Sequence, residues 1–251
     1  MTTNDDVAAV ILAAGIGKRM KSDLAKVLHL ALGRPLVEHV LDAVHAAGIE
    51  RIVVVIGHQA DRVREALAGR PVECAEQLEQ LGTGHAVQQA APLLQSHRGD
   101  VVVLCGDTPL LTGETLRRLC EVHRTTGAAA TVLTAEMQDP TGYGRVIRAE
   151  DGGVLRIVEH EDATDEERRV REINSGLYVF AAPALFEAVA KVDADNAQGE
   201  YYLTDTLEIL RRAGRRVSAY RCPDPRQVLG VNDPDQLREA ERHLAQRVGN
   251  E

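Results

Sequence analysis

The chain has 251 residues and a formal net charge of −9 at pH 7, from 29 Lys and Arg against 38 Asp and Glu residues. Because neutralising nucleic-acid phosphates takes a basic surface, this balance argues against a general nucleic-acid-binding protein. The five Tyr and two Phe, without any Trp, are too few to build platforms on which bases stack. The length is that of one large domain, which can fold without disulfides or a structural metal.

The apolar segments are too short to span a bilayer. The runs Val7–Ala14 and Ile52–Ile56 fall far below the roughly 20 residues that a membrane helix needs. The polar start of the chain lacks the basic segment of a secretory signal, so we expect a cytoplasmic protein that does not contact membranes. The four cysteines are scattered without a Cys-x-x-Cys pair, which argues against a zinc ribbon, a thioredoxin motif and a disulfide framework.

Unbroken β-branched runs predict strands in the first half of the chain. Strands without polar alternation are typical of a sheet that helices cover on both faces. Segments with helical spacing of apolar residues lie between these runs, so the pattern predicts an α/β fold with a doubly wound, mostly parallel sheet. The expected strands are 7–12, 52–56, 101–104 and 130–133, and the expected helical faces fall within 36–44, 63–67, 86–91 and 116–123.

The pattern changes after about residue 139. Turn signals at 142–144 and 151–153 and the charged stretch 159–171 predict a small β-rich insertion that faces the substrate. No repeat or linker interrupts the chain, so we expect a single domain over 1–251, divided at about 138 and 232. The later elements are expected as a strand at 176–180, helices at 183–192 and 204–213, a strand at 217–220 and a closing helix at 234–248.

A glycine-bearing turn, Leu12-Ala-Ala-Gly-Ile-Gly-Lys-Arg-Met20, follows the first strand directly. In a doubly wound sheet such a loop borders the ligand crevice, and its glycines let backbone N–H groups approach phosphate. The spacing fits neither the dinucleotide-binding fingerprint nor the P-loop. Four basic residues within nine positions favour a phosphate site over an ordinary basic surface loop only if other residues agree; they are Lys18, Arg19, Lys21 and Lys26.

Two further segments carry candidate ligand groups. Asp107 ends an aliphatic strand in Gly106-Asp-Thr-Pro109, where it could hold Mg²⁺ beside a phosphate or could simply cap a turn. Gln77 presents both a donor and acceptors, as reading a base edge requires. The glycine-rich turn that follows it, Gly82-Thr-Gly-His85, could supply backbone contacts, with Thr83 alternatively a helix N-cap.

These motifs occur together and in order, and with them the chain resembles the uridyltransferase domain of the bacterial bifunctional N-acetylglucosamine-1-phosphate uridyltransferase/glucosamine-1-phosphate acetyltransferases, which are sugar nucleotidyltransferases. The resemblance spans nearly the whole chain. Besides the turn after the first strand, it rests on Lys26-Val-Leu-His29, Glu79-Gln-Leu-Gly-Thr-Gly-His85, Gly142-Tyr-Gly-Arg145, Ile157-Val-Glu-His160, Glu172-Ile-Asn-Ser-Gly176, Gly199-Glu-Tyr-Tyr-Leu-Thr-Asp205 and Gly230-Val-Asn232.

The resemblance implies a Rossmann-like nucleotidyltransferase fold that transfers uridylyl from UTP to N-acetylglucosamine 1-phosphate with Mg²⁺. It implies a nucleotide-binding core over about 1–138, a sugar-binding part over about 139–232 and a closing helix over 233–251. The implied roles are catalysis by Arg19 and Lys26; nucleotide binding by Leu12, Ala13, Ala14, Gly15, Gln77, Gly82 and Thr83; sugar binding by Gly106, Gly144, Glu159, Asn174, Tyr201 and Thr204; and Mg²⁺ binding by Asp107 and Asn232.

Departures from the family pattern leave alternatives open. Ala25 stands where proline is usual and is expected to loosen the loop before Lys26, while Cys105 replaces a common tyrosine and Ser175 a threonine. A different sugar phosphate or nucleotide therefore remains an alternative, as does a non-catalytic sugar-nucleotide-binding protein. No hexapeptide repeats are present, so the acetyltransferase activity and trimer of the resembled proteins are not implied, and the oligomeric state stays open.

Overall fold

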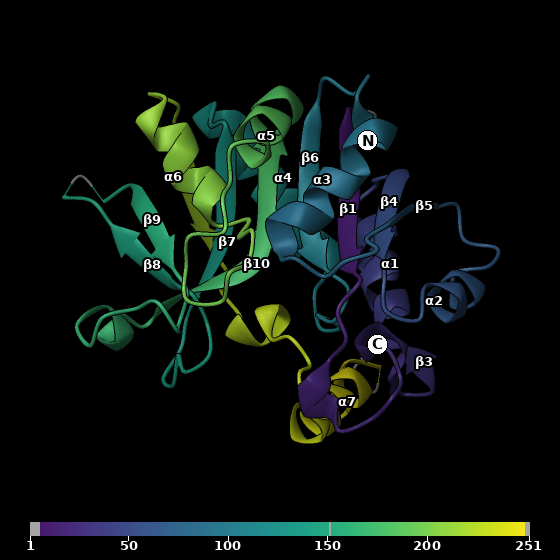
Figure 1. Ribbon diagram of the computed structural model, residues 1–251. Helices are drawn as coiled ribbons and strands as arrows, with labels where there is room; N and C mark the ends of the chain where they lie inside the picture. The colour runs from purple at the N-terminus through teal and green to yellow at the C-terminus, as the bar shows by residue number, and fades with distance from the viewer. Residues whose placement is uncertain (1–5, 151, 249–251) are drawn as a thin grey trace.

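The computed structural model describes residues 6–150 and 152–248. Within them a nine-stranded sheet forms the centre of the molecule, with seven strands in the order β11-β7-β10-β6-β1-β4-β5 (Figure 1). The strands β8 and β9 form a hairpin attached to β10. The strand bounds are β1 (Val7–Ala13), β4 (Arg51–Ile56), β5 (Glu73–Glu76), β6 (Asp100–Cys105), β7 (Ala130–Glu136), β8 (Arg145–Arg148), β9 (Val154–Val158), β10 (Glu172–Ala181) and β11 (Val217–Arg221).

The sheet is mostly parallel, as the sequence predicts. Strand β1 pairs in parallel with β4 and β6, β4 with β5, and β11 with β7. Strand β10 is the exception, because it runs antiparallel to β6 and β7. Its first half pairs with β8 and its second half with β6, and the register against β7 shifts between Asn174 and Tyr178. This irregular segment of β10 therefore lies where the hairpin joins the parallel core.

Helices cover both faces of the sheet, which confirms the predicted doubly wound architecture. Alternate side chains of β1 belong to two separate apolar clusters. Ile11 lies in the cluster that includes residues of α1, α2 and α4, and Val10 lies in the one that includes residues of α3, α5 and α6. All the residues of this strand from Val7 to Ile11 are buried, which explains the absence of polar alternation. The helices are α1 (Leu36–Ala46), α2 (Ala60–Ala66), α3 (Thr83–Leu94), α4 (Gly113–Thr126), α5 (Ala182–Val189) and α6 (Asp205–Arg212).

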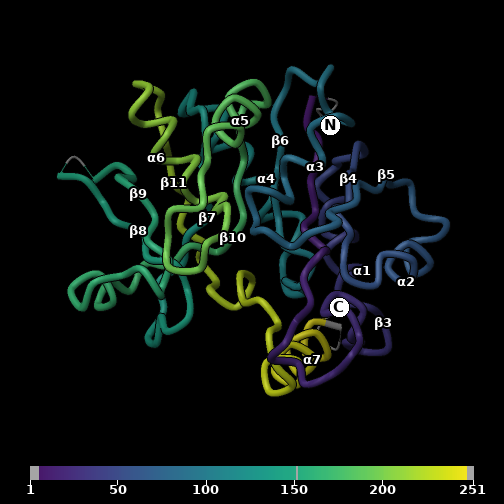
Figure 2. The backbone as a smooth tube through the Cα atoms, in the orientation of Figure 1, coloured from purple at the N-terminus to yellow at the C-terminus, as the bar shows by residue number. Residues whose placement is uncertain are grey.

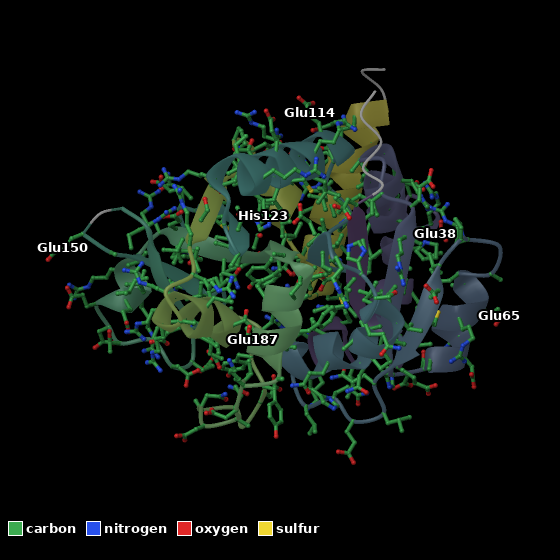
Figure 3. The ribbon with its side chains drawn as sticks, turned by 90° about the horizontal axis from the view of Figure 1, so that it is seen from above. Glu38, Glu65, Glu114, His123, Glu150 and Glu187 are labelled. Carbon is green, nitrogen blue, oxygen red and sulfur yellow. The ribbon has the colours of Figure 1, made fainter. Side chains whose placement is uncertain are left out.

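One buried histidine joins α4 to the sheet. His123 is 3% exposed, and its Nδ1 lies 2.9 Å from the hydroxyl of Thr131, while its Nε2 lies 3.4 Å from a carboxylate oxygen of Asp100. Figure 3 shows this side chain within the outline of the molecule, whereas Glu38, Glu65, Glu114 and Glu150 lie near its edge in that view. Burial alone would raise the pKa of Asp100, but its contacts with His123 and Arg124 outweigh that effect and hold the pKa below its usual range.

The C-terminal helix α7 (Pro234–Val248) packs against the loops that follow β1 rather than against the sheet (Figure 2). Its Leu237, Ala240 and Leu244 join a small apolar cluster with Met20 and Leu36. A short hairpin of β2 (Leu30–Ala31) and β3 (Arg34–Pro35) lies beside it.

None of the helices in residues 6–150 and 152–248 is long and apolar enough to cross a membrane. Single-turn 3-10 helices occupy Lys18–Met20, Lys26–Leu28, Glu167–Arg169 and Pro225–Val228.

Candidate active site

A cavity of about 710 Å³ opens at the carboxyl ends of β1 and β6. This is where ligands bind in open α/β sheets. Its walls come from the turn after β1, the loop between β5 and α3, the end of β6 and the segment before α7. The structure thus brings together ten of the residues expected from the sequence, namely Leu12, Ala14, Gly15, Arg19, Lys26, Gln77, Gly82, Thr83, Asp107 and Asn232.

Lys26 connects two polar side chains of this cavity. Its ammonium forms an ion pair with the Asp107 carboxylate and donates a hydrogen bond to the Asn232 side-chain oxygen at 3.1 Å. The backbone fixes both partners, since Val231 N–H donates to Asp107 O at 2.9 Å and Asn232 N–H to the Gln236 side chain at 2.7 Å. Three distant segments of the chain therefore hold one positive charge between two oxygen ligands.

The arrangement around Lys26 fits a divalent cation. The oxygens of Asp107 and Asn232 already converge on a positive charge, that of the Lys26 ammonium. Hard oxygen donors suit Mg²⁺, which typically takes one or two protein ligands and completes its shell with water and substrate phosphates. No group of three or more His, Cys, Asp or Glu side chains that could hold a metal alone occurs among the described residues. The donor set thus matches a cation shared with a phosphate ligand.

The glycine-bearing turn brings the basic residues close to this pair. Gly17 has φ +71°, and a Cβ at this position would lie 2.7 Å from the Lys26 Cβ, so only glycine allows the two segments to approach. The next residues form the 3-10 turn in which Met20 is buried and Arg19 is exposed along the cavity. Ala13, at 1% exposure, belongs to the core and does not line the cavity.

Gln77 also lines the cavity and is almost fully buried, at 3% exposure. Its side-chain nitrogen donates to Gly82 O at 3.1 Å and to His85 Nδ1 at 3.0 Å. Its side-chain oxygen makes no hydrogen bond to other described residues. The amide is therefore held in one orientation by the turn that precedes α3, with an acceptor left over for a ligand.

Thr83 does not cap α3. The N-cap is Gly82, without a side-chain cap, and the Thr83 hydroxyl accepts a hydrogen bond from Leu203 N–H at 3.1 Å. Two backbone hydrogen bonds accompany it, from Gly84 N–H to Tyr201 O at 2.7 Å and from Tyr201 N–H to Leu81 O at 2.8 Å. The loop expected to read the base is thus joined directly to the loop that carries Tyr201 and Thr204.

Four of the six residues expected to bind sugar, Gly144, Glu159, Asn174 and Thr204, form a second cluster outside the cavity lining, whereas Gly106 and Tyr201 lie elsewhere. Thr204 donates to a Glu159 carboxylate oxygen at 3.2 Å, and Asn174 N–H donates to Gly144 O at 2.9 Å. A Cβ on Gly144 would lie 3.2 Å from the other Glu159 oxygen. The cluster is next to the irregular segment of β10, where a Cβ on Gly176 would lie 3.2 Å from the sulfur of Cys105. Cys105 also lines the cavity and so connects the two groups.

Burial changes the ionisation of this cluster. Burial, and after it the nearby Asp205 and Asp162, raises the pKa of Glu159 despite the hydrogen bond from Thr204. Burial and three neighbouring carboxylates raise the pKa of Asp205 to about 6. Burial, followed by the charge of Asp107, raises the pKa of the Cys105 thiol to about 12, so the thiol is neutral and unreactive near pH 7.

Ser175 faces away from these groups. Its hydroxyl donates to Leu133 O at 2.6 Å and accepts from Leu177 N–H at 3.1 Å, which stabilises the irregular part of β10. The neighbouring Asn174 oxygen accepts from Gly176 N–H and from the Tyr178 hydroxyl. Gly106, which donates to Leu12 O at 2.9 Å, fixes the end of β6 to the end of β1.

The cavity wall also contains residues that were not expected from the sequence. Gln80 and Glu200 line it, and the Gln80 side chain donates to Gln77 O at 3.0 Å. Both residues lie within stretches that carry the family resemblance, Glu79–His85 and Gly199–Asp205, and this resemblance was the available signal.

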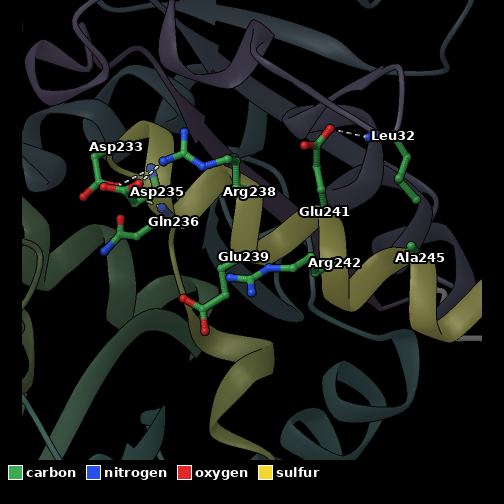
Figure 4. Close-up of a pocket in the computed structure, with 9 residues that line it drawn as sticks. All are labelled: Leu32, Asp233, Asp235, Gln236, Arg238, Glu239, Glu241, Arg242 and Ala245. Atoms are coloured by element: carbon green, nitrogen blue, oxygen red, sulfur yellow. Dashed lines mark hydrogen bonds and ion pairs between the residues drawn. The ribbon is translucent and has the colours of Figure 1, made fainter.

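A second hollow, of about 820 Å³, lies on the outer side of α7 (Figure 4). Charges of both signs line it, including an ion pair of Arg238 with Asp235, and Leu32 N–H donates to Glu241 at 3.2 Å. None of the expected site residues lies there. Ten of the expected residues thus line the cavity beside Lys26, and none lines this hollow.

Comparison with known proteins identifies the family. The MobA-like NTP transferase domain matches residues 9–211, which is most of the chain. The chain belongs to the MobA-like NTP transferase family. This nucleotidyltransferase is therefore an enzyme, and the family membership agrees with the cavity at the carboxyl edge of the sheet.

Similar proteins support the resemblance found in the sequence. The chain is 54% identical over 240 residues to the "Bifunctional protein GlmU" of Geobacillus thermodenitrificans, covering 96% of this chain and 52% of that protein. The proteins of the same name from Pelotomaculum thermopropionicum and Geobacter metallireducens are 54% and 53% identical over 97% and 98% of this chain, and 53% and 52% of their own lengths. The nucleotidyltransferase thus spans about half the length of these curated relatives.

Proposed function

We propose that the protein transfers uridylyl from UTP to N-acetylglucosamine 1-phosphate, forming UDP-N-acetylglucosamine and pyrophosphate with Mg²⁺. The observation that carries this proposal is the convergence of Arg19, Lys26, Asp107 and Asn232 on one cavity. Two negatively charged reactants must meet for this reaction, and this cavity offers both cationic side chains and oxygen ligands for a cation. The proposed Mg²⁺ would be held by Asp107 and Asn232.

The reaction needs positioning and charge compensation rather than a general base. A sugar-phosphate oxygen forms a bond to the α-phosphorus of UTP while the bond to the pyrophosphate oxygen breaks, and pyrophosphate leaves with that electron pair. The nucleophile already carries its negative charge, so no proton has to be removed. When bound, Mg²⁺ supplies charge neutralisation on the phosphates. Arg19 and Lys26 add positive charge from the two loops that Gly17 allows to approach.

The remaining residues are assigned to the two substrates, the nucleotide in the cavity and the sugar beside it. The free oxygen of Gln77 would accept a hydrogen bond from uracil, and the backbone of Leu12–Gly15 with that of Gly82 would hold the nucleotide. The sugar would lie beyond Cys105 in the part formed by about 139–232, and the core of about 1–138 would hold UTP, with α7 as the closing helix. Residues 1–5 and 249–251 of these expected parts lie outside the described residues. The proposed sugar-binding residues are Gly106, Gly144, Glu159, Asn174, Tyr201 and Thr204.

A panel assay of pyrophosphate release tests the proposal. Each nucleoside triphosphate is combined with each of several sugar 1-phosphates, with Mg²⁺ and with the metal chelated. The expected result is the highest kcat/KM for UTP with N-acetylglucosamine 1-phosphate, and loss of turnover without the metal. A higher kcat/KM for another pair would replace the proposed substrates. The small Cys105 side chain between the two groups makes another sugar phosphate the alternative to include first.

A further inference from the structure

The loop that leads into Lys26 is held by a side chain outside the cavity. The Gln59 amide nitrogen donates to Asp23 O at 2.7 Å, and its oxygen accepts from Ala25 N–H at 3.0 Å. The His58 ring lies 3.4 Å from the same Asp23 carbonyl. Within the described residues, the hydrogen bonds that tie 22–25 to distant parts of the chain come from His58 and Gln59. One amide therefore fixes the loop at two points.

Gln59 adopts an unusual backbone conformation to make these bonds. Its φ of +53° and ψ of +43° lie in the left-handed region, which side chains other than glycine, Asn and Asp seldom occupy. Such conformations persist where the surrounding structure fixes them, and they are frequent at functional sites. At this position glycine would be less strained but would carry no amide. The turn itself therefore does not require glutamine, and what the Gln59 side chain adds is its pair of hydrogen bonds to Asp23 and Ala25.

The two hydrogen bonds of the Gln59 amide to Asp23 and Ala25 are called the Gln59 clamp below. The residues just before Gln59 contact the part of the cavity proposed to bind the nucleotide. His58 N–H donates to Ala14 O at 3.1 Å. A Cβ on Gly57 would lie 2.8 Å from the Ala14 Cβ and 2.8 Å from Gln77 O. Gly57 packs against both Ala14 and Gln77, and His58 is bonded to Ala14, so the residues that lead into Gln59 are tied to the site where UTP is proposed to bind.

The backbone N–H of Ala25 is one of the two groups that the Gln59 clamp holds. The sequence predicts that alanine, in place of the usual proline, loosens this loop, but Ala25 is fully buried and its N–H is hydrogen-bonded to Gln59. A proline could not donate this bond, because it has no N–H. The next residues continue into the 3-10 turn that presents Lys26 to Asp107 and Asn232. A proline ring would restrict the conformation of this loop, and here a hydrogen bond from the Ala25 N–H to the Gln59 side chain does so instead.

We propose that Gln59 is a positioning residue for Lys26. It does not line the cavity, and it acts by holding Asp23 and Ala25 so that the Lys26 ammonium stays between its two oxygen partners. This inference rests on the proposed function, in which Lys26 acts on the phosphates.

Gln59→Gly tests the inference, because it removes the amide while suiting the left-handed backbone. The expected result is a kcat about 10- to 100-fold lower, as displacement of a catalytic group produces, with no loss of thermal stability. Leu32→Gly is the matched control. Leu32 also has a positive φ, of +49°, but lies on the β2–β3 turn away from the cavity, so kcat should not change.

Two readouts separate positioning from a general structural effect. In a Lys26→Ala background, Gln59→Gly should lower kcat no further, because its effect passes through Lys26. Amide hydrogen exchange over 21–28 should quicken in Gln59→Gly and stay unchanged in Leu32→Gly. This exchange is independent of turnover, so it tests the clamp even if the wild-type protein fails the substrate panel. Unchanged exchange, or an equal loss of kcat in the Lys26→Ala background, would overturn the inference.

Discussion

Lys26 and Asp107 form an ion pair at the carboxyl edge of the sheet, with both side chains mostly buried. Lys26 comes from the loop after β1, and Asp107 follows β6, which is the parallel neighbour of β1. Parallel pairing places the ends of both strands at the same edge, and Gly106 N–H bonded to Leu12 O fixes their spacing. The strand order thus determines the polar centre of the proposed site.

Replacing Asp107 by alanine should lower turnover by at least ~10²-fold, as removal of a charge-stabilising group does. The variant loses the carboxylate proposed to bind Mg²⁺ and leaves Lys26 without its ion-pair partner. Pyrophosphate release measured against Mg²⁺ concentration checks this, with circular dichroism to establish that the fold is kept. Asp107→Asn, which keeps the shape, should need more Mg²⁺ than the wild type. Unchanged turnover at limiting Mg²⁺ would remove Asp107 from the proposed metal site.

Arg19→Ala should lower kcat by about 10- to 1,000-fold with little change in thermal stability. Arg19 is exposed along the cavity and no hydrogen bond or ion pair ties it to other described residues, so its loss costs the fold little. A cation aimed at charge that develops in the transition state contributes mainly to kcat. Lys21→Ala is the matched control, because Lys21 is also basic and exposed in the same loop but does not line the cavity. Equal effects of the two substitutions would contradict a specific role for Arg19.

The core strands could be predicted because a strand that is buried on both faces has an unbroken run of aliphatic residues. β1 and β6 are unbroken aliphatic runs, and both lie where that pattern predicts. β5 carries no such run, because as the edge strand of the path it is only partly buried. The direction of β10 was also beyond prediction, since a fully buried strand has the same composition whether it runs parallel or antiparallel. The helix expected over 183–192 ends earlier, at Val189.

Some residues of the candidate site could also be predicted from the sequence, and others could not. Sequence position alone indicated Asp107 and the glycine-bearing turn, since each follows a buried strand. Asn232 became a candidate only through the family resemblance, because its contact with Lys26 depends on where the chain returns after β11. Gln59 carried no signal at all, as its role rests on two side-chain hydrogen bonds and an unusual backbone angle. Contacts of this kind depend on the folded path and not on local pattern.

As the pH falls, the KM for the sugar phosphate should begin to rise at a higher pH than it would if Glu159 had the pKa of an ordinary glutamate. Burial raises the pKa of Glu159, so this carboxylate protonates early as the pH falls and loses its charge as an acceptor for sugar hydroxyls. Initial rates between pH 8 and pH 5 measure the effect. Glu159→Gln should keep a high KM at every pH and lose this part of the pH dependence.

The same substitution should affect stability in the opposite sense. A carboxyl whose pKa is raised by folding is destabilised in its ionised form, so neutral Gln at position 159 should raise the Tm at pH 8 and have less effect at pH 5. Asp205→Asn is a necessary control, because Asp205 titrates at about pH 6 beside the same cluster. A KM profile that follows Asp205→Asn and not Glu159→Gln would assign the pH dependence to Asp205.

Thr83→Val should raise the KM for the sugar phosphate several-fold while changing the KM for UTP less. The Thr83 hydroxyl accepts from Leu203 N–H, and the next residue, Thr204, donates to Glu159. Valine keeps the shape of threonine but leaves the buried Leu203 N–H unpaired, which costs about 1–3 kcal/mol. The loop would then hold Thr204, and through it Glu159, less firmly. Thr83→Ser retains the hydroxyl and should restore the wild-type KM values. If instead Thr83→Val raised only the KM for UTP, Thr83 would act on the nucleotide directly and not through the loop that carries Thr204.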